Sequence, residues 1–342
     1  MKKEIEIYLD KHFDVYGYVS VKEYIERRNE KAGMKLDHSF LDGYKTIVTL
    51  GLSHPSEEVK YKGKGYGILS RFSYGLDYHK VVGEKLKMLS NDLDLLGIKS
   101  YGSVDVSKLN EKDAAMYSNI GFQGKNQLLI NKIYGSYMYL STLLIDTLID
   151  KNIVAVDDCG ECTLCIDACP SGALDNGFKR ELCISHISQE KIPFDISQIS
   201  HFKKTIYGCD ICQKVCPKNK GIDFHLHSNF EPDGNENINI KELLLMSNRE
   251  FKAKYGNNTS SWVGPLVIKR NAICIVRNQG LKEYLPIIKE LSEKHKDVLW
   301  YNKTANIIIN EFEREWFYES YCTIPTRNTA KHWKYYENLR CK

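Results

Sequence analysis

The sequence lacks a hydrophobic run long enough to cross a lipid bilayer. A membrane-spanning helix needs about 18–20 consecutive apolar residues, and no stretch of the chain approaches that length. The first residues, MKKEIEIYLDKHF, are too polar for a secretory signal peptide. The pair Arg27 and Arg28 is followed by NEKAGMKLDHS rather than by an apolar segment, which excludes a twin-arginine export signal. These absences predict a cytoplasmic protein that makes no membrane contact.

A strong charge of either sign is also absent. The 48 Lys and Arg residues nearly balance the 44 Asp and Glu residues, so the formal net charge is +4. This mild charge does not by itself indicate a nucleic-acid-binding protein. A dinucleotide motif is missing too, because GKGYG at 63–67 has the wrong spacing for a Rossmann fingerprint and no helix with an acidic partner follows it. No nicotinamide or flavin motif emerges elsewhere.

Cysteine is abundant, and eight of the eleven cysteines lie between residues 151 and 230. Because cytoplasmic thiols stay reduced, such clustering indicates metal or redox chemistry rather than disulfides. The first group, CGECTLCIDACP from Cys159, has the Cys-x2-Cys-x2-Cys-x3-Cys-Pro spacing of bacterial ferredoxins, which bind cubane 4Fe–4S clusters. The second group, CDICQKVCP at 209–217, is one cysteine short. Cys183, between the two groups, is the obvious source of the missing thiolate.

Ferredoxin spacing also predicts how the ligands divide between two clusters. The first three cysteines of a motif bind one cluster, and the fourth, before proline, binds the other. The predicted ligands are Cys159, Cys162, Cys165 and Cys216 for cluster one, and Cys169, Cys183, Cys209 and Cys212 for cluster two. Two structural zinc sites are the alternative, since CxxC pairs also bind zinc. Zinc does not require the x2-x2-x3-Cys-Pro pattern, which favours iron–sulfur. Cys274 is predicted to be a core residue of an apolar helix.

Composition divides the chain into three predicted domains. Residues 1–150 mix helical periodicity with short β-like runs and predict a mixed domain of the α+β or α/β class. Residues 151–230 form a ferredoxin-like module with two 4Fe–4S clusters. Residues 231–342 show apolar residues at i, i+3, i+4 spacing in short consecutive helices, which indicates HEAT-like helical hairpins.

Within the first predicted domain, one helix is expected at 83–97 and β-strands at 44–54, 98–105 and 126–132. Segments 69–81 and 121–141 are rich in Gly, Tyr, Ser and Asn, which suits a loop-built pocket. Two cubanes transfer electrons one at a time, so we expect an electron acceptor within this chain. The residue pattern alone predicts a two-cluster reductase with an unknown acceptor, and gives Tyr78 and His79 a structural role.

Several motifs together are similar to those of the epoxyqueuosine reductase family. They are the pair VD at 104–105, GFQGKNQLLI, YGSY at 134–137, CGECTLCIDACPSGAL, YGCDICQKVCPKNKG and DFHLH at 223–227. The resemblance spans about residues 44–280. It implies a base-off cobalamin between the N-terminal domain and the ferredoxin module, reduced by the clusters to cob(I)alamin. It also implies reduction of epoxyqueuosine to queuosine at the tRNA wobble position, with loss of water. The implied partners are tRNA and a low-potential donor such as flavodoxin or ferredoxin, and the implied state is a monomer.

The resemblance implies that Asp105 is the catalytic proton donor, because it matches the aspartate of the family's Val-Asp-Thr stretch, with Val106 in place of Thr. Burial against the corrin is expected to raise the pKa of Asp105 and keep it protonated near neutrality. Without the resemblance, an aspartate at a strand end more often caps a turn. The implied cobalamin contacts are Ser70, Asp105, Asn126, Leu129, Leu140 and Ser185.

This sequence departs from the family pattern at three places. Ser70 stands where Cys is often found, Lys112 stands where Arg is common, and the loop KLDHSFLDGYK is shortened. These changes concern the periphery of the cobalamin or tRNA site rather than the clusters.

A tRNA substrate would need local positive charge. The wobble base must leave its stack to reach a buried cobalt, and the phosphates beside it need cations nearby. Lys203 and Lys204, between Cys183 and Cys209, are the predicted tRNA contacts, with the basic, aromatic tail TRNTAKHWKYYENLRCK as a second region. Two alternatives to this function stay open at this point: a cobalamin-dependent reductive dehalogenase, and a non-catalytic iron–sulfur electron carrier.

Overall fold

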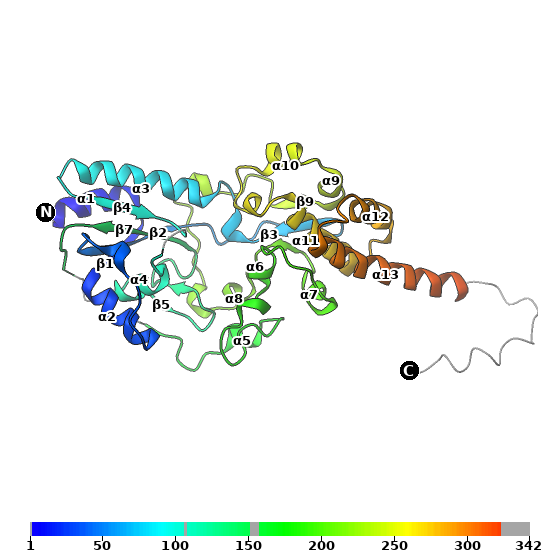
Figure 1. Ribbon diagram of the computed structural model, residues 1–342, viewed down its shortest axis with the longest axis horizontal. Helices are drawn as coiled ribbons and strands as arrows, with labels where there is room; N and C mark the ends of the chain where they lie inside the picture. Colours follow the sequence, from blue (N-terminus) through cyan, green and yellow to red (C-terminus); the bar gives the residue numbers. More distant parts are fainter. Residues whose placement is uncertain (1, 106–107, 151–156, 323–342) are drawn as a thin grey trace, which may run out of the picture.

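The computed structural model describes residues 2–105, 108–150 and 157–322 (Figure 1). Its N-terminal part is built on a four-stranded antiparallel sheet. The strand order is β1 (Val15–Ser20), β2 (Thr46–Ser53), β7 (Met138–Ile145) and β4 (Ser100–Ser103). Every residue of β2 is buried, so both faces of the sheet must be covered by other elements.

Two pairs of helices cover the two faces of this sheet. Helices α1 (Lys2–His12) and α3 (Tyr78–Asp94) pack on one face, and α2 (Val21–Ala32) and α4 (Glu111–Tyr117) on the other, as Figure 1 shows. The strand residues alternate accordingly, because neighbouring side chains of a strand point to opposite faces. Val48 packs with α1 and α3, whereas Ile47 packs with α2.

A second, three-stranded sheet joins distant parts of the chain. Its order is β8 (Thr205–Tyr207), β3 (Tyr66–Leu69) and β9 (Asn237–Asn239). Strand β3 pairs in parallel with β8 and antiparallel with β9. Each of the three segments predicted as separate domains therefore contributes one strand to this sheet.

The cysteine-rich region contains only short elements. Its helices are α5 (Leu164–Asp167), α6 (Ile184–Ile187), α7 (Ile196–His201) and α8 (Ile211–Lys214). A two-stranded hairpin, β5 (Phe122–Gln123) and β6 (Leu129–Ile130), is contributed by the N-terminal part. The nine cysteines from Cys159 to Cys274 form no disulfide.

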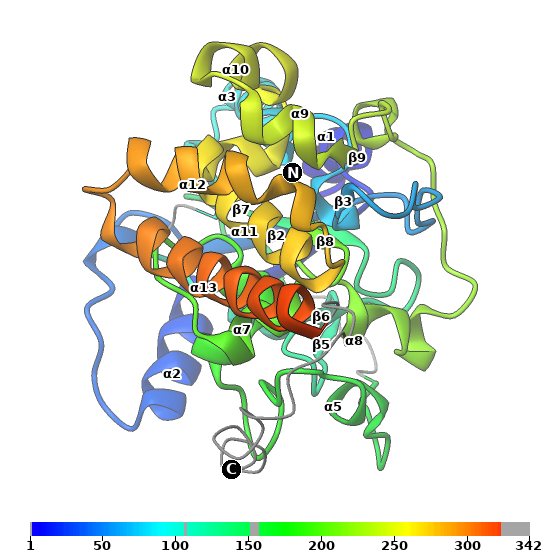
Figure 2. The same ribbon diagram turned by 90° about the vertical axis from the view of Figure 1, so that its right-hand side faces the viewer.

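The C-terminal part is helical, as the sequence predicts. It contains α9 (Ile240–Leu245), α10 (Asn248–Tyr255), α11 (Pro265–Asn278), α12 (Leu285–Lys294) and α13 (Leu299–Cys322). Ten consecutive residues of α11 are buried, because α13 packs along it (Figure 2) and α7, α9 and strand β8 lie against it as well. No helix in the described ranges is both long enough and apolar enough to span a membrane.

The segment 121–141 lines a cavity, as predicted, through Asn126, Gln127, Leu128, Ser136 and Met138, but it is not built of loops alone. It contains the β5–β6 hairpin, and β7 begins inside it and forms a central strand of the large sheet. The predicted strand at 126–132 is reduced to β6. The polar, Gly-rich start of the segment concealed the apolar run that follows it. The predicted tRNA-binding tail, 324–342, lies outside the described residues.

Candidate active site

The eight motif cysteines line two separate cavities. The smaller one is lined by Cys159, Cys162, Cys165 and Cys216. The larger one, of about 650 Å³, is lined by several elements and by Cys169, Cys183, Cys209 and Cys212. The fold therefore divides the cysteines into the same two groups of four as the ferredoxin spacing does. Four thiolates around one small space suit a cubane cluster.

Tight turns of the backbone aim the thiols of the first group inward. The amide of Cys162 donates to the carbonyl of Cys159 at 3.1 Å, and the amide of Lys125 donates to the Cys159 sulfur at 3.4 Å. Hydrogen bonds to cluster sulfurs are among the features that set a cluster's reduction potential. The β5–β6 hairpin that carries Lys125 thus belongs to the wall of the first cysteine site.

The second group depends on Cys183, and the segment after Cys183 is fixed by helix α11. Arg270 is fully buried, and its guanidinium donates to the carbonyls of Ile187, Glu190 and Ile192 at 3.0, 2.6 and 2.8 Å. The neighbouring Asn271 donates to the carbonyls of Ser188 and Ile206, both at 2.8 Å. Helix α11 therefore ties the Cys183 segment to strand β8, which leads into Cys209.

The larger cavity can accommodate a flat organic cofactor beside the second cysteine group. Phe178 and Trp262 line it and are 43% and 61% exposed, respectively, so apolar surface is open to a ligand there. Asn126 lines it as well, and its buried Nδ2 has no hydrogen-bond partner within the described residues. An amide group of a bound ligand would satisfy this donor.

Only two of the six predicted cobalamin contacts line this cavity. Asn126 and Ser185 line its wall. Ser70 and Leu129 are buried and are not on that wall, and Leu140 is half-buried beside the hydrophobic cluster that contains Leu129. Asp105 lines a neighbouring cavity of about 320 Å³, whose wall shares Lys112 with the larger one.

Asp105 is held by side chains from helices α3 and α4. It lies just after β4 with a φ of 56°, in the left-handed region that aspartate tolerates better than most residues. The Tyr78 hydroxyl donates to Asp105 Oδ2, and His79 Nε2 lies 3.1 Å from the same oxygen. The amide of Asp105 donates to Glu111 Oε1 at 2.9 Å. Asp77 in turn accepts from His79 Nδ1 at 2.7 Å.

The proton in this group lies on a residue that the sequence did not single out. Burial raises the pKa of Asp105, but hydrogen bonds from His79 and Tyr78 outweigh it and bring that pKa below its ordinary value. Burial and the negative charge of Asp105 raise the pKa of Glu111 to about 8. Hydrogen bonds to Asp105 and Asp77 raise the pKa of His79 to about 9. The raised pKa that the sequence led us to expect for Asp105 thus belongs to Glu111.

Sequence reasoning missed Glu111 as a partner and gave Tyr78 and His79 a structural role. The only available signal for Glu111 was a second carboxylate six residues after Asp105, at the start of a predicted helix. The signal for His79 was its Asp-x-His spacing from Asp77. At this spacing the aspartate caps helix α3 and also accepts a hydrogen bond from the His79 imidazole, which orients the ring.

The two lysines predicted to bind tRNA have different surroundings. Lys203 is exposed. Lys204 is half-buried, its Nζ lies 3.1 Å from Glu58 Oε1, and it stacks over the ring of Tyr61. Glu58 also binds Lys214. The charge of Lys204 is therefore largely engaged within the protein, whereas Lys203 presents its charge to solvent.

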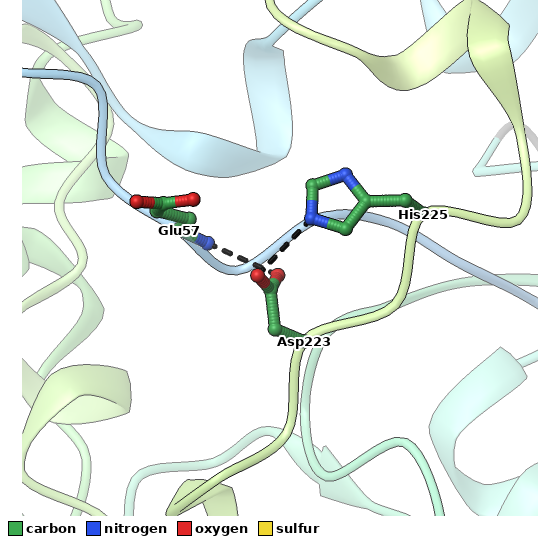
Figure 3. A group of neighbouring side chains, drawn as sticks. All are labelled: Glu57, Asp223 and His225. Carbon is green, nitrogen blue, oxygen red and sulfur yellow. Dashed lines mark hydrogen bonds and ion pairs between the residues drawn. The ribbon is translucent and has the colours of Figure 1, made fainter.

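A group of exposed side chains joins two loops elsewhere (Figure 3). It consists of Glu57, Asp223 and His225. The amide of Glu57 donates to Asp223 at 3.2 Å, and the two ring nitrogens of His225 bind Asp223 and Glu231. Hydrogen bonds to Glu231 and Asp223 raise the pKa of His225. A histidine with a carboxylate on each nitrogen is held as a cation, so we assign this group to loop attachment.

Comparison with known proteins identifies two family regions. Residues 38–106 match the family described as "Epoxyqueuosine reductase QueG, DUF1730", and residues 158–219 match the "4Fe-4S double cluster binding domain". The second match shows that the cysteine-rich region is an iron–sulfur domain, which decides against zinc.

Curated relatives match most of the chain. Epoxyqueuosine reductase of Bacillus subtilis is 38% identical over 74% of this chain and 67% of its own length. That of Lactococcus garvieae is 38% identical over 74% of each chain. Among solved structures, epoxyqueuosine reductase with an epoxyqueuosine-modified tRNA-Tyr stem loop has a TM-score of 0.81 at 33% identity, covering 91% of this chain and 90% of its own.

A further solved structure is also similar. It is that of epoxyqueuosine reductase from Bacillus subtilis with an aspartate catalytic loop swung out of the active site, and it has a TM-score of 0.79, 33% identity and coverage of 91% of this chain and 90% of its own. Both the sequences and the structures of these relatives agree with this chain over most of its length, and the chain belongs to the epoxyqueuosine reductase family.

Proposed function

We propose that this chain reduces epoxyqueuosine to queuosine in the anticodon of tRNA, at the wobble position. One observation carries the proposal: a four-cysteine site opens onto a large cavity, and an aspartate fixed by three side chains lines the adjoining one. The family relationship and the relative bound to a modified tRNA stem loop support it.

The proposed iron–sulfur ligands follow the two cysteine-lined cavities. Cluster one is bound by Cys159, Cys162, Cys165 and Cys216. Cluster two is bound by Cys169, Cys183, Cys209 and Cys212. Because cluster two adjoins the large cavity, we propose that electrons from a low-potential donor such as flavodoxin or ferredoxin pass through cluster one to cluster two.

We propose that the large cavity holds cobalamin, which supplies reducing electrons to the substrate when bound. The exposed Phe178 and Trp262 give its ring system an apolar surface, and the unpartnered Asn126 amide and Ser185 provide polar contacts. Leu129 and Leu140 pack in one cluster with Met138 of the cavity wall, and Ser70 lies against Gly208, next to Cys209. Asp105 faces the neighbouring cavity, where it delivers a proton to the departing oxygen.

We further propose that the chain acts as a monomer in the cytoplasm, where a tRNA substrate is available. Regions 1–150, 151–230 and 231–342 supply the cofactor-binding, iron–sulfur and helical parts, and α11 to α13 stack as HEAT-like helices. The exposed Lys203 contacts the tRNA backbone, with Lys204 as a weaker contact because of its ion pair with Glu58.

The test is a nucleoside analysis of tRNA treated with the purified protein. Protein reconstituted with iron, sulfide and cobalamin is incubated with epoxyqueuosine-containing tRNA and a low-potential reductant, and digested nucleosides are measured by mass spectrometry. Queuosine should form. The Asp105→Asn variant keeps the shape without the acid, so its rate should fall by roughly 10²–10⁴-fold. Failure of the fully reconstituted wild type to form queuosine would overturn the proposed function.

A further inference from the structure

We propose that Glu111 stores one of the two protons that each turnover consumes and passes it to Asp105. This inference rests on the proposed function. Removing the epoxide oxygen as water breaks both of its C–O bonds and forms a carbon–carbon double bond. The balance requires two electrons, which the low-potential donor supplies through the clusters, and two protons. The Asp105–Glu111 pair holds one of these protons, and the charged His79, whose Nε2 lies 3.1 Å from Asp105 Oδ2, is the source of the other.

Asp105 and Glu111 are close enough for their charges to interact. Both line the same cavity, and Glu111 Oε1 accepts the amide of Asp105 at 2.9 Å. Two ionised carboxylates at such close range repel each other. One proton held by the pair removes this repulsion, in line with the pKa of Glu111, which burial and the charge of Asp105 raise to about 8.

The surroundings of the pair decide which carboxyl group carries that proton. On the side of α3, Asp105 Oδ2 faces Tyr78, which donates to it, and His79, which is charged because it lies between Asp105 and Asp77. These donors favour an ionised Asp105. Within the described ranges, no Lys, Arg or His side chain forms an ion pair with the Glu111 carboxyl group, so Glu111 keeps the proton.

Two lysines also line this cavity, and neither neutralises Glu111 by direct contact. Lys112 donates to the carbonyl of Gln127 at 2.9 Å. Lys31 lies 2.7 Å from Asp113, which also binds Arg28 and is itself buried. Their charges are thus directed to other acceptors, and the proton between Asp105 and Glu111 remains available for transfer.

Glu111 also positions the backbone of Asp105. Its carboxylate oxygen receives the amide of Asp105, whose backbone has a φ of 56°. A hydrogen bond at this point holds the turn that presents Asp105. Gln at position 111 would still accept that bond through its amide oxygen but could not pass on a proton. Positioning and proton storage can therefore be separated by substitution.

The first experiment detects the stored proton without substrate or cobalamin. Infrared spectra of the cluster-loaded protein are recorded between pH 6 and 9.5, with glutamate or aspartate labelled by ¹³C at the side-chain carboxyl. We expect a protonated-carboxyl band that shifts with the glutamate label and disappears with a midpoint near pH 8. Glu111→Gln should abolish it. A band that follows the aspartate label, or persists in Glu111→Gln, would overturn the inference.

The second experiment uses turnover of the cobalamin-loaded protein with tRNA. Wild-type activity should fall as the pH rises through the pKa of Glu111, because the stored proton is lost. Glu111→Gln should be slower by about 10²-fold, at the low end of general-acid effects, and should no longer show that decline. Glu111→Asp, which retains an acid, should recover the decline. Wild-type rates and pH dependence in Glu111→Gln would refute proton storage. A wild type that forms no queuosine refutes the proposed function, while the infrared result still reports on the carboxyl pair.

Discussion

Cluster one takes all four of its proposed ligands from the two Cys-Pro motifs, whereas cluster two takes Cys183 from the long segment between them. The first site is completed by local turns and by the amide of Lys125. The second is completed by a segment that has only short helices of its own. The two proposed sites use the same thiolate chemistry, but only the second requires the long segment between the motifs to be ordered.

The supports of the two sites differ in kind. The Cys183 segment is fixed by the fully buried Arg270, which stacks on Phe194 at 3.8 Å and donates to three carbonyls. Burial lowers the pKa of Arg270 to about 9, so the side chain remains charged at neutral pH. On the cluster-one side, the buried side chains of Gln213 and Asn219 hold the chain around Cys216, because they donate to Ser136 Oγ at 3.1 and 2.8 Å. The chain then runs to an exposed group in which His225 binds Asp223 and Glu231.

This difference between the two sites shows which chain segment needs additional stabilising contacts. A segment inserted between metal ligands loses conformational entropy when it is ordered, and short helices do not compensate for that loss alone. Helix α11 compensates through buried hydrogen bonds, so the C-terminal helices support the proposed second iron–sulfur site. Cluster one takes three of its proposed ligands from one short motif, and the outermost attachment on its side is the exposed His225 group.

The largest expected effect comes from removing the inserted ligand itself. Cys183→Ala should reduce iron from about eight to about four atoms per chain, because one of two cubanes is lost. The matched variant Cys162→Ala should also lose about four, but from the other cluster. Electron paramagnetic resonance of the reduced proteins should show a different surviving signal in each. Full iron content in Cys183→Ala would exclude it as a ligand.

The next effect concerns the buried support of cluster two. Arg270→Met leaves the carbonyls of Ile187, Glu190 and Ile192 without donors, at a cost of about 1–3 kcal/mol each. We expect a lower melting temperature together with selective loss of the cluster-two signal. Ile273→Ala is the control, because it creates a cavity in the same helix at a comparable cost of about 2–5 kcal/mol.

The control separates positioning from general stability. Ile273 belongs to the hydrophobic core and is absent from the hydrogen bonds that fix the Cys183 segment. Its variant should melt earlier yet retain both cluster signals below its melting temperature. Equal loss of both clusters in Arg270→Met and Ile273→Ala would show that α11 supports the whole fold and not cluster two in particular.

A smaller effect is expected on the surface of the same inserted segment. Lys203 is exposed, whereas Lys204 is bound by Glu58. Lys203→Gln should therefore weaken binding of a modified tRNA stem loop more than Lys204→Gln does, and should reduce the slope of log affinity against log salt by about 1. Both variants should keep their cluster spectra. Equal affinities and slopes in wild type and Lys203→Gln would place the tRNA backbone elsewhere.

The two cluster sites also differ in how far the sequence predicts them. Cysteine ligands follow a spacing that is local in the chain, so the two groups of four could be proposed from the sequence alone. The supports of cluster two could not. Arg270 lies in the helical stretch KRNAICIVRN, and only the tertiary structure shows that its guanidinium donates to carbonyls of residues 187–192.

The same limit applies to the acid site. Asp105 follows β4, Tyr78 and His79 begin α3, and Glu111 begins α4. These elements meet because the antiparallel sheet and its covering helices bring them together, which no local spacing reveals. The central strand β7 was missed for a related reason, since its apolar residues follow a polar, Gly-rich hairpin without a clear break.

The smallest expected effect concerns the exposed attachment on the cluster-one side. The folded-state pKa of His225 is raised by its hydrogen bonds to Glu231 and Asp223. Its stabilising contribution is thus fully present below the unfolded-state pKa of about 6.5 and is lost as the pH rises through the raised folded-state value. Because the groups are exposed, solvent screens the interaction and keeps the effect small.

Melting temperatures of the reconstituted protein between pH 6 and 9 measure this contribution. Wild type should lose slightly more stability across that range than His225→Gln, and Glu231→Gln should remove most of the same difference because it removes the carboxylate on Nδ1. Both variants should keep full iron, since the attachment holds a loop beyond the ligands. His225→Gln could instead lose cluster one, or could destabilise the protein as much as Arg270→Met does. Either result would show that the exposed group is as important to cluster one as Arg270 is to cluster two, and would contradict the difference inferred between the two sites.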